Sequence, residues 1–128
     1  MPRRDDLEFL LDFDGAVFAF EAGYWIKIKA RLVAPDVSRP HGVDYSLTLH
    51  DHTGRRILGF DNAHPVSRGK RKSAGNDHWH RAEDDTGRVY EFTDGHGLIA
   101  DFFREAERVL KERGVDFKSA VRKDGGKA

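Results

Sequence analysis

Apolar and polar residues alternate along the first half of the chain, and this period-two pattern predicts half-buried β-strands. Residues 7–13 and 16–20 alternate on either side of Asp14-Gly15, a pair that tolerates the backbone angles of a tight turn, so we expect a hairpin there. The cleanest alternation runs from Tyr24 to Leu32, where the polar face carries three cations, Lys27, Lys29 and Arg31. That face is therefore either solvated or directed toward an anion.

A second hairpin is expected after residues 34–42, which contain two prolines and cannot continue a strand. Residues 43–50 alternate strictly, and residues 56–61 return after a turn at residues 51–54. We expect this hairpin near the centre of the sheet. Two shorter strands are predicted at residues 78–81 and 88–92, joined by an acidic turn.

From Leu98 the apolar residues recur at spacings of three and four, which is the period of an amphipathic helix. Thr93 or Asp94 can cap its first turn, and Gly114 suits a left-handed helix end. The predicted fold is therefore α+β: a single two-layer domain in which one C-terminal amphipathic helix packs on one face of an antiparallel sheet of about five to seven strands.

Composition narrows the class of protein. The 128 residues suffice for one domain, which we place at residues 1–117, followed by a disordered tail at 118–128. A formal net charge of +0 gives no global argument for a nucleic-acid or membrane partner, and the absence of cysteine excludes disulfides and thiolate chemistry. No apolar run approaches the roughly 18 residues of a membrane span, and no signal peptide is evident, so we expect a cytoplasmic protein.

Candidate chemistry is concentrated between Gly59 and Arg81. His78 and His80 lie two apart on a predicted strand, which places them on one face about 6.5 to 7 Å apart. Histidine titrates near neutral pH, so such a pair can supply a general base and a general acid. The same spacing also suits two metal ligands, and it equally fits two histidines of an ordinary polar surface.

Further polar residues flank this pair. Asp61, Asn62 and His64 end a predicted strand, where functional groups often gather, although Asp and Asn also form turns by bonding their own backbone. Asp77 and Arg81 border the histidine strand. The intervening loop carries four cations that could hold phosphate or could simply be solvated: Arg68, Lys70, Arg71 and Lys72.

Several of these motifs occur together in one known family. The segments 39–50, 56–64 (with Phe-Asp-Asn), 77–81 (Asp-His-Trp-His-Arg), 90–92 and 98–103 resemble the TumE-like toxins of prokaryotic toxin–antitoxin pairs. The resemblance covers roughly residues 7 to 112. It implies a small growth-inhibiting toxin encoded beside a helix-turn-helix antitoxin and acting on RNA, and it brings the residues Asp61, Asn62, His64, Asp77, His78, His80 and Arg81 into the candidate site.

Three hypotheses follow for the chemistry. The first is a metal-independent endoribonuclease, without cofactor, in which histidines transfer protons and Arg81 with the basic loop stabilises the charged transition state. The second is a nuclease in which His64, Asp77, His78 and His80 bind a divalent cation that activates water. The third is a non-enzymatic module that binds RNA or protein through the basic loop and the cationic strand at residues 27–31. The scarcity of closely paired carboxylates favours the first.

Overall fold

The computed structural model describes residues 4–35, 42–62, 78–80, 88–89 and 94–123, and at residues 4–5, 78–80 and 88–89 it describes the backbone only. Within these residues the elements follow one another as α1 (Arg4–Leu11), β1 (Val17–Ala19), the 3₁₀ turn η1 (Glu21–Gly23), β2 (Trp25–Leu32), β3 (Val43–His50), β4 (Arg56–Asp61), β5 (His78–His80), β6 (Arg88–Val89), α2 (Gly95–Glu112), the 3₁₀ turn η2 (Phe117–Ser119) and β7 (Val121–Arg122).

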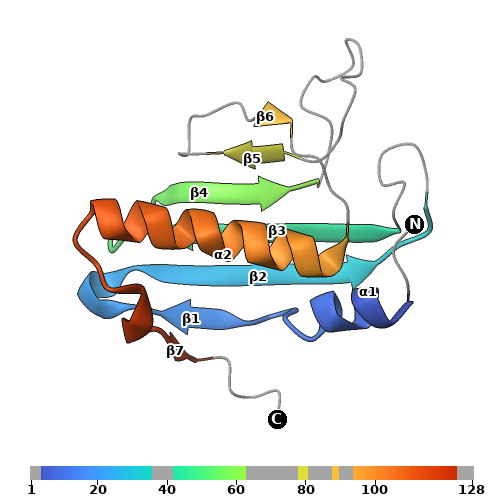
Figure 1. The fold of residues 1–128 in the computed structure, drawn as a ribbon, viewed down its shortest axis with the longest axis horizontal. Helices are drawn as coiled ribbons and strands as arrows, with labels where there is room; N and C mark the ends of the chain where they lie inside the picture. Colours follow the sequence, from blue (N-terminus) through green and yellow to red (C-terminus); the bar gives the residue numbers. More distant parts are fainter. Residues whose placement is uncertain (1–3, 36–41, 63–77, 81–87, 90–93, 124–128) are drawn as a thin grey trace.

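The described strands form one antiparallel sheet of seven strands in the order β6-β5-β4-β3-β2-β1-β7. The long helix α2 runs across one face of this sheet, while β5 and β6 extend it beyond β4 (Figure 1). The predicted α+β two-layer fold is confirmed, and the hairpin of β3 and β4 is central as expected.

The core lies between α2 and the inward-facing positions of β2 and β3. Burial alternates residue by residue in β3, where Val43, Tyr45, Leu47 and Leu49 are buried and their neighbours are only half-buried. This is the packing that the alternating sequence requires when one face of a strand meets a helix. Phe102 of α2 reaches across to the sheet and packs edge-on against Phe60 of β4, with ring centroids 5.5 Å apart.

Both ends of α2 are fixed as the sequence suggests. Asp94 is the N-cap, and its side chain accepts a hydrogen bond from the backbone N–H of Gly97. At the other end Gly114 has φ +77°, a conformation that suits glycine, and its N–H donates to the carbonyl of Lys111. Thr93, the other predicted cap, lies outside the described residues.

The prediction of a strand at residues 7–13 is wrong, because Arg4–Leu11 form helix α1. The alternating positions also contain helical neighbours four apart, such as Leu7 and Leu11, and the intervening Leu10 is fully buried. Over so short a stretch the two periods cannot be separated. Asp14-Gly15 does form a turn, but it leads from a helix into β1 instead of closing a hairpin.

The predicted disordered tail is also wrong in part. Residues 117–119 form η2, and Val121–Arg122 form the edge strand β7 on β1. The guanidinium of Arg122 lies over the rings of Phe13 and Phe18, at 5.8 and 5.6 Å from their centroids. Such cation–π contacts stabilise the packing of this charged segment against the aromatic rings. Residues 124–128 lie outside the described residues.

Candidate functional site

The candidate site begins on the polar face of the sheet, opposite α2. In an antiparallel pair, residues that face each other across the strands share one side of the sheet. The register of β2 with β3 therefore lines up Lys27 with Thr48 and Lys29 with Ser46 on this side. The cationic face predicted for β2 is thus half-buried at Lys27 and exposed at Lys29 and Arg31.

The register of β4 with β5 brings the two halves of the predicted site together. Asp61 pairs with His78, and Gly59 pairs with His80, so backbone positions about twenty residues apart in sequence are direct neighbours. Of the remaining predicted site residues, those in the basic loop and beside it lie outside the described residues: His64, Arg68, Lys70, Arg71, Lys72, Asp77 and Arg81.

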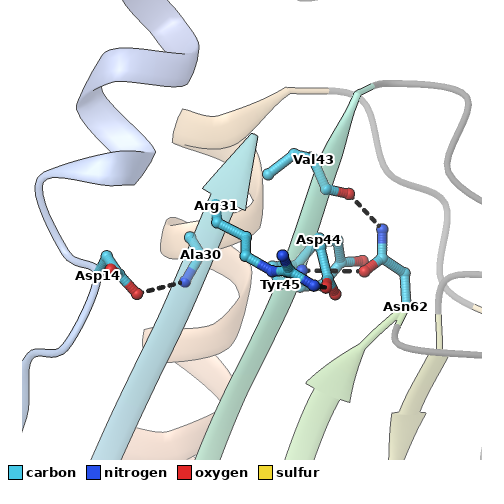
Figure 2. A network of polar contacts seen from close by, with 7 residues as sticks. All are labelled: Asp14, Ala30, Arg31, Val43, Asp44, Tyr45 and Asn62. Carbon is cyan, nitrogen blue, oxygen red and sulfur yellow. Dashed lines mark hydrogen bonds and ion pairs between the residues drawn. The ribbon is translucent and has the colours of Figure 1, made fainter. Parts of the chain in front are cut away.

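Asn62 has a clear structural role at the end of β4. Its side chain is buried, with 2 % exposure. The side-chain oxygen accepts from the backbone N–H of Tyr45 at 3.0 Å, and the side-chain nitrogen donates to the carbonyl of Val43 at 2.8 Å (Figure 2). Both partners belong to β3, so the amide group continues the hydrogen bonding of the two strands past the last ladder pair. Asn62 thereby fixes where the chain leaves the sheet after Asp61.

A pocket of about 300 Å³ opens where β2 ends and β3 begins, and Tyr45, the hydrogen-bond partner of Asn62, is one of its lining residues. The guanidinium of Arg31 donates to the carboxylate of Asp44 at 3.0 and 3.2 Å, and Lys29 adds a second cation to the lining. On its far side, the carboxylate of Asp14 accepts from the backbone N–H of Ala30 at 2.9 Å (Figure 2). This pocket was not anticipated from the sequence.

A second histidine environment lies on the same face, at the turn between β3 and β4. His50 stacks on Trp25 with ring centroids 4.0 Å apart and an interplanar angle of 9°. One ring nitrogen, Nδ1, lies 3.1 Å from the carbonyl of Gly54, and the other, Nε2, lies 2.9 Å from the hydroxyl of Thr48. A carbonyl only accepts, so Nδ1 must carry a proton there and Nε2 can accept from Thr48.

Arg56 lies on the same face of the sheet, a placement that the sequence did not predict. Leu49 pairs with Leu58, yet the next residue of β3, His50, pairs with Arg56, so Ile57 is an extra residue in β4. This β-bulge brings Arg56 and Gly59 to one face although they are three apart. The Arg56 side chain then lies over Gly59, and a glycine inside a strand is the signal that could have indicated such a close approach.

Neither a metal-ligating cluster nor a membrane-spanning helix occurs among the described residues. Within those ranges, no three or more histidine and acidic side chains are grouped as a metal ion would require. Among the helices that are described, none is long and apolar enough to cross a membrane.

A small antiparallel sheet with one long helix on one face, carrying polar side chains on the other, is a scaffold shared by many functions. Comparison with protein families is more specific. The family model described as Toxin TumE matches residues 6–110, which is most of the chain. The chain therefore belongs to the TumE toxin family, and it is the toxin component of a toxin–antitoxin system, with an antitoxin as its partner. No curated protein and no solved structure matches it.

Proposed function

We propose that this toxin is a metal-independent endoribonuclease, a hydrolase that cuts phosphodiester bonds of RNA. The observation that supports this most is the β4–β5 register, which sets His78 opposite Asp61 and His80 opposite Gly59. Two imidazoles two apart on a strand suit a reaction with two proton transfers, and the adjacent carboxylate of Asp61 suits the task of orienting one of them.

The proposed reaction uses the ribose itself as the nucleophile. One of His78, His80 or His64 removes the proton of the 2′-hydroxyl, whose oxygen attacks the adjacent phosphorus. A second histidine protonates the departing 5′-oxygen as the bond from phosphorus to that oxygen breaks. The products of this step are a 2′,3′-cyclic phosphate and a free 5′-hydroxyl, and water then opens the cyclic phosphate to complete the hydrolysis. Neither step requires an oxidant, a cofactor or a metal ion.

The other predicted residues have supporting tasks. Arg81 and the basic loop, with Arg68, Lys70, Arg71 and Lys72, would hold the RNA backbone and stabilise the extra negative charge of the transition state. Asp61 and Asp77 would orient the histidines. Asn62 acts through position only, since both polar atoms of its side chain are bonded to the backbone of β3.

We further propose that the antitoxin partner is a helix-turn-helix protein and that the toxin acts in the cytoplasm, where its RNA substrate is. Co-expression tests the pairing: a neighbouring helix-turn-helix gene should restore growth and co-purify with the toxin. Failure of such a protein both to bind and to neutralise would contradict this part of the proposal.

The nuclease proposal is tested on purified protein with an RNA strand and an all-deoxy strand of the same sequence, each with and without a chelator. We expect cleavage of RNA alone, unaffected by the chelator. His78→Ala and His80→Ala should each lower the rate by about 10²- to 10⁴-fold, because each removes a proton-transfer group. His52→Ala is the matched control, since His52 is exposed in the β3–β4 turn away from β5.

Other results would replace the proposal with a stated alternative. Cleavage of DNA, or loss of RNA cleavage in the chelator, would indicate the metal-dependent nuclease in which His64, Asp77, His78 and His80 bind the cation. RNA binding without any cleavage product, unchanged by the histidine substitutions, would indicate a binding module that uses the cationic strand at residues 27–31.

A further inference from the structure

We propose that Arg56, held across Gly59, is a phosphate-contacting residue of the same site, and that Gly59 is the residue that positions it. The inference rests on the proposed function, because it names the group that meets the RNA backbone beside His80. Its first two supports are independent of the histidines, since they come from β4 and its pairing with β3.

The first support is the bulge at Ile57. Regular alternation would put Arg56 and Gly59 on opposite faces of β4, because they are three residues apart. The extra residue reverses this: Arg56 pairs with His50, Gly59 pairs with Thr48, and those two positions of β3 share the polar face. Ile57 and Leu58 both remain buried in the core, so the bulge redirects the arginine without exposing apolar surface.

The second support is the space above Gly59. A Cβ atom at this position would lie 3.1 Å from Cδ of Arg56, 3.3 Å from Nη1 and 3.5 Å from Nε. The three heavy atoms nearest to this Cβ position all belong to Arg56, so the arginine side chain lies over the glycine. The Nε atom is itself buried. The stem of Arg56 is thus restrained, and a restrained guanidinium loses less entropy when it binds an anion.

The third support is what surrounds this position. Gly59 has Thr48 of β3 on one side and His80 of β5 on the other, and Lys27 lies beyond Thr48 in the same row. Neighbouring strands are about 4.8 Å apart, so the Gly59 backbone beneath the Arg56 side chain lies one strand spacing from the His80 backbone. A planar guanidinium can donate two parallel hydrogen bonds to a phosphate. Arg56 is therefore placed to hold the phosphate on which the proposed histidines act.

Salt-dependent binding measures this contact directly. The probe is a short mixed-sequence RNA with 2′-O-methyl riboses, which cannot react through a 2′-hydroxyl, and its anisotropy is followed as salt is raised. Loss of one phosphate contact lowers the slope of log affinity against log salt by about one. We expect this decrease for Arg56→Gln. The control Arg55→Gln removes the same charge from the neighbouring exposed turn residue and should leave the slope nearly unchanged.

A double-mutant cycle tests the role of Gly59. Gly59→Ala adds one methyl group whose three nearest heavy atoms all belong to the Arg56 side chain, so the fold should persist, as urea unfolding would verify. We expect it to weaken binding several-fold in the natural sequence and to have no further effect beside Arg56→Ala, because the glycine acts through the arginine. Equal effects of Gly59→Ala in both backgrounds would overturn the positioning role.

The two proposals fail in different ways. An unchanged salt slope in Arg56→Gln, or no salt-dependent binding by the natural protein, would overturn the inference about Arg56, whatever the histidine variants do. Undiminished RNA cleavage by His78→Ala and His80→Ala would overturn the proposed acid–base chemistry while leaving the binding result for Arg56 intact.

Discussion

The carboxylate of Asp6 in α1 caps α2 by accepting a hydrogen bond from the backbone N–H of Gly95, 89 residues away, at 2.6 Å. It also accepts from the N–H of His96 at 3.1 Å and contacts that residue's ring nitrogen Nδ1. A helix begins with several N–H groups that have no partner within the helix. Asp6 satisfies two of them from another element, so α1 and the start of α2 are fixed together.

Asp6 makes the stability of this junction dependent on pH. Burial of the carboxyl would raise its pKa, but the hydrogen bonds from Gly95 and His96 outweigh burial, so the pKa of Asp6 is lowered. A lowered pKa in the folded protein means that the carboxylate stabilises the fold above its unfolded pKa of about 3.9 and loses this effect as pH falls through the folded pKa. We expect the free energy of unfolding to decrease below about pH 4, measured by urea titration at several pH values.

Substitution of Asp6 distinguishes its contribution to acid sensitivity from that of the other acidic residues. Asp6→Ala leaves the N–H of Gly95 buried without an acceptor, which we expect to cost roughly 1 to 3 kcal/mol at neutral pH. The variant should also be less sensitive to acid than the natural protein. Asp12→Asn is the matched control, because Asp12 is an exposed acid just after α1. Equal acid sensitivity of the natural protein and Asp6→Ala would contradict the assignment.

The Asp6–Gly95 contact also explains why α1 escaped sequence reasoning. Over seven residues both periods have support, since Leu7, Phe9 and Leu11 fit alternation while Leu7, Leu10 and Leu11 fit helical spacing. What selects the helix is the docking of Leu10 and Asp6 against the first residue of α2, and no local pattern encodes a contact so distant in sequence. Longer patterns predicted their elements correctly, because β2, β3 and α2 are each long enough for only one of the two periods to fit.

In the candidate site, too, some features could be predicted from the sequence and others could not. The sequence indicated Asp61 and His78 as polar candidate residues on two predicted strands, and the register sets their backbones opposite each other. The bulge that brings Arg56 to this face was hidden, because Ile57 and Leu58 are both apolar and read equally well as a regular strand. The pocket beside Arg31 depends on where β2 ends and β3 begins, which side-chain type alone does not determine.

Asn62 should matter for stability more than for chemistry. Asn62→Ala removes a donor and an acceptor from the backbone of Val43 and Tyr45, and we expect a loss of roughly 2 to 4 kcal/mol in the free energy of unfolding, since each buried group left without a partner costs about 1 to 3 kcal/mol. Asn62→Asp should be at least as damaging, because an oxygen would then face the carbonyl of Val43. Ser46→Ala on the polar face is the control, with a small expected effect.

Activity measurements on the folded fraction complete this test. If Asn62 only shapes the site, the fraction of Asn62→Ala that remains folded should keep RNA binding and cleavage within a few-fold of the natural protein. A fully folded variant that had lost cleavage would instead show that the amide takes part in the reaction.

In its neutral form, the His50 ring should adopt one defined tautomer. The carbonyl of Gly54 requires a proton on Nδ1 of His50. The hydroxyl of Thr48 has one proton and two acceptors within reach, Nε2 of His50 at 2.9 Å and the carbonyl of Lys27 at 3.4 Å. We expect it to donate to the nearer acceptor, Nε2. We expect nitrogen NMR shifts of the neutral His50 ring to report the Nδ1–H form. The Nε2–H form, or a ring that averages between the two, would contradict this arrangement.

Gly23 should tolerate alanine far less well than Gly54, although both have a positive φ, +84° and +91°. A left-handed backbone conformation costs a residue with a side chain about 1 to 2 kcal/mol. No atom lies within 4 Å of a Cβ at Gly54, so we expect Gly54→Ala to lower the free energy of unfolding by that amount only. At Gly23 the Cβ would also lie 2.7 Å from Cβ of His52 and 3.4 Å from its Cα, so the β1–β2 and β3–β4 turns would have to separate. We expect Gly23→Ala to be clearly the less stable variant in urea unfolding. Because His52→Gly in the same chain would remove the opposing Cβ, it should restore part of the loss, and no recovery would show that the two turns do not pack as described.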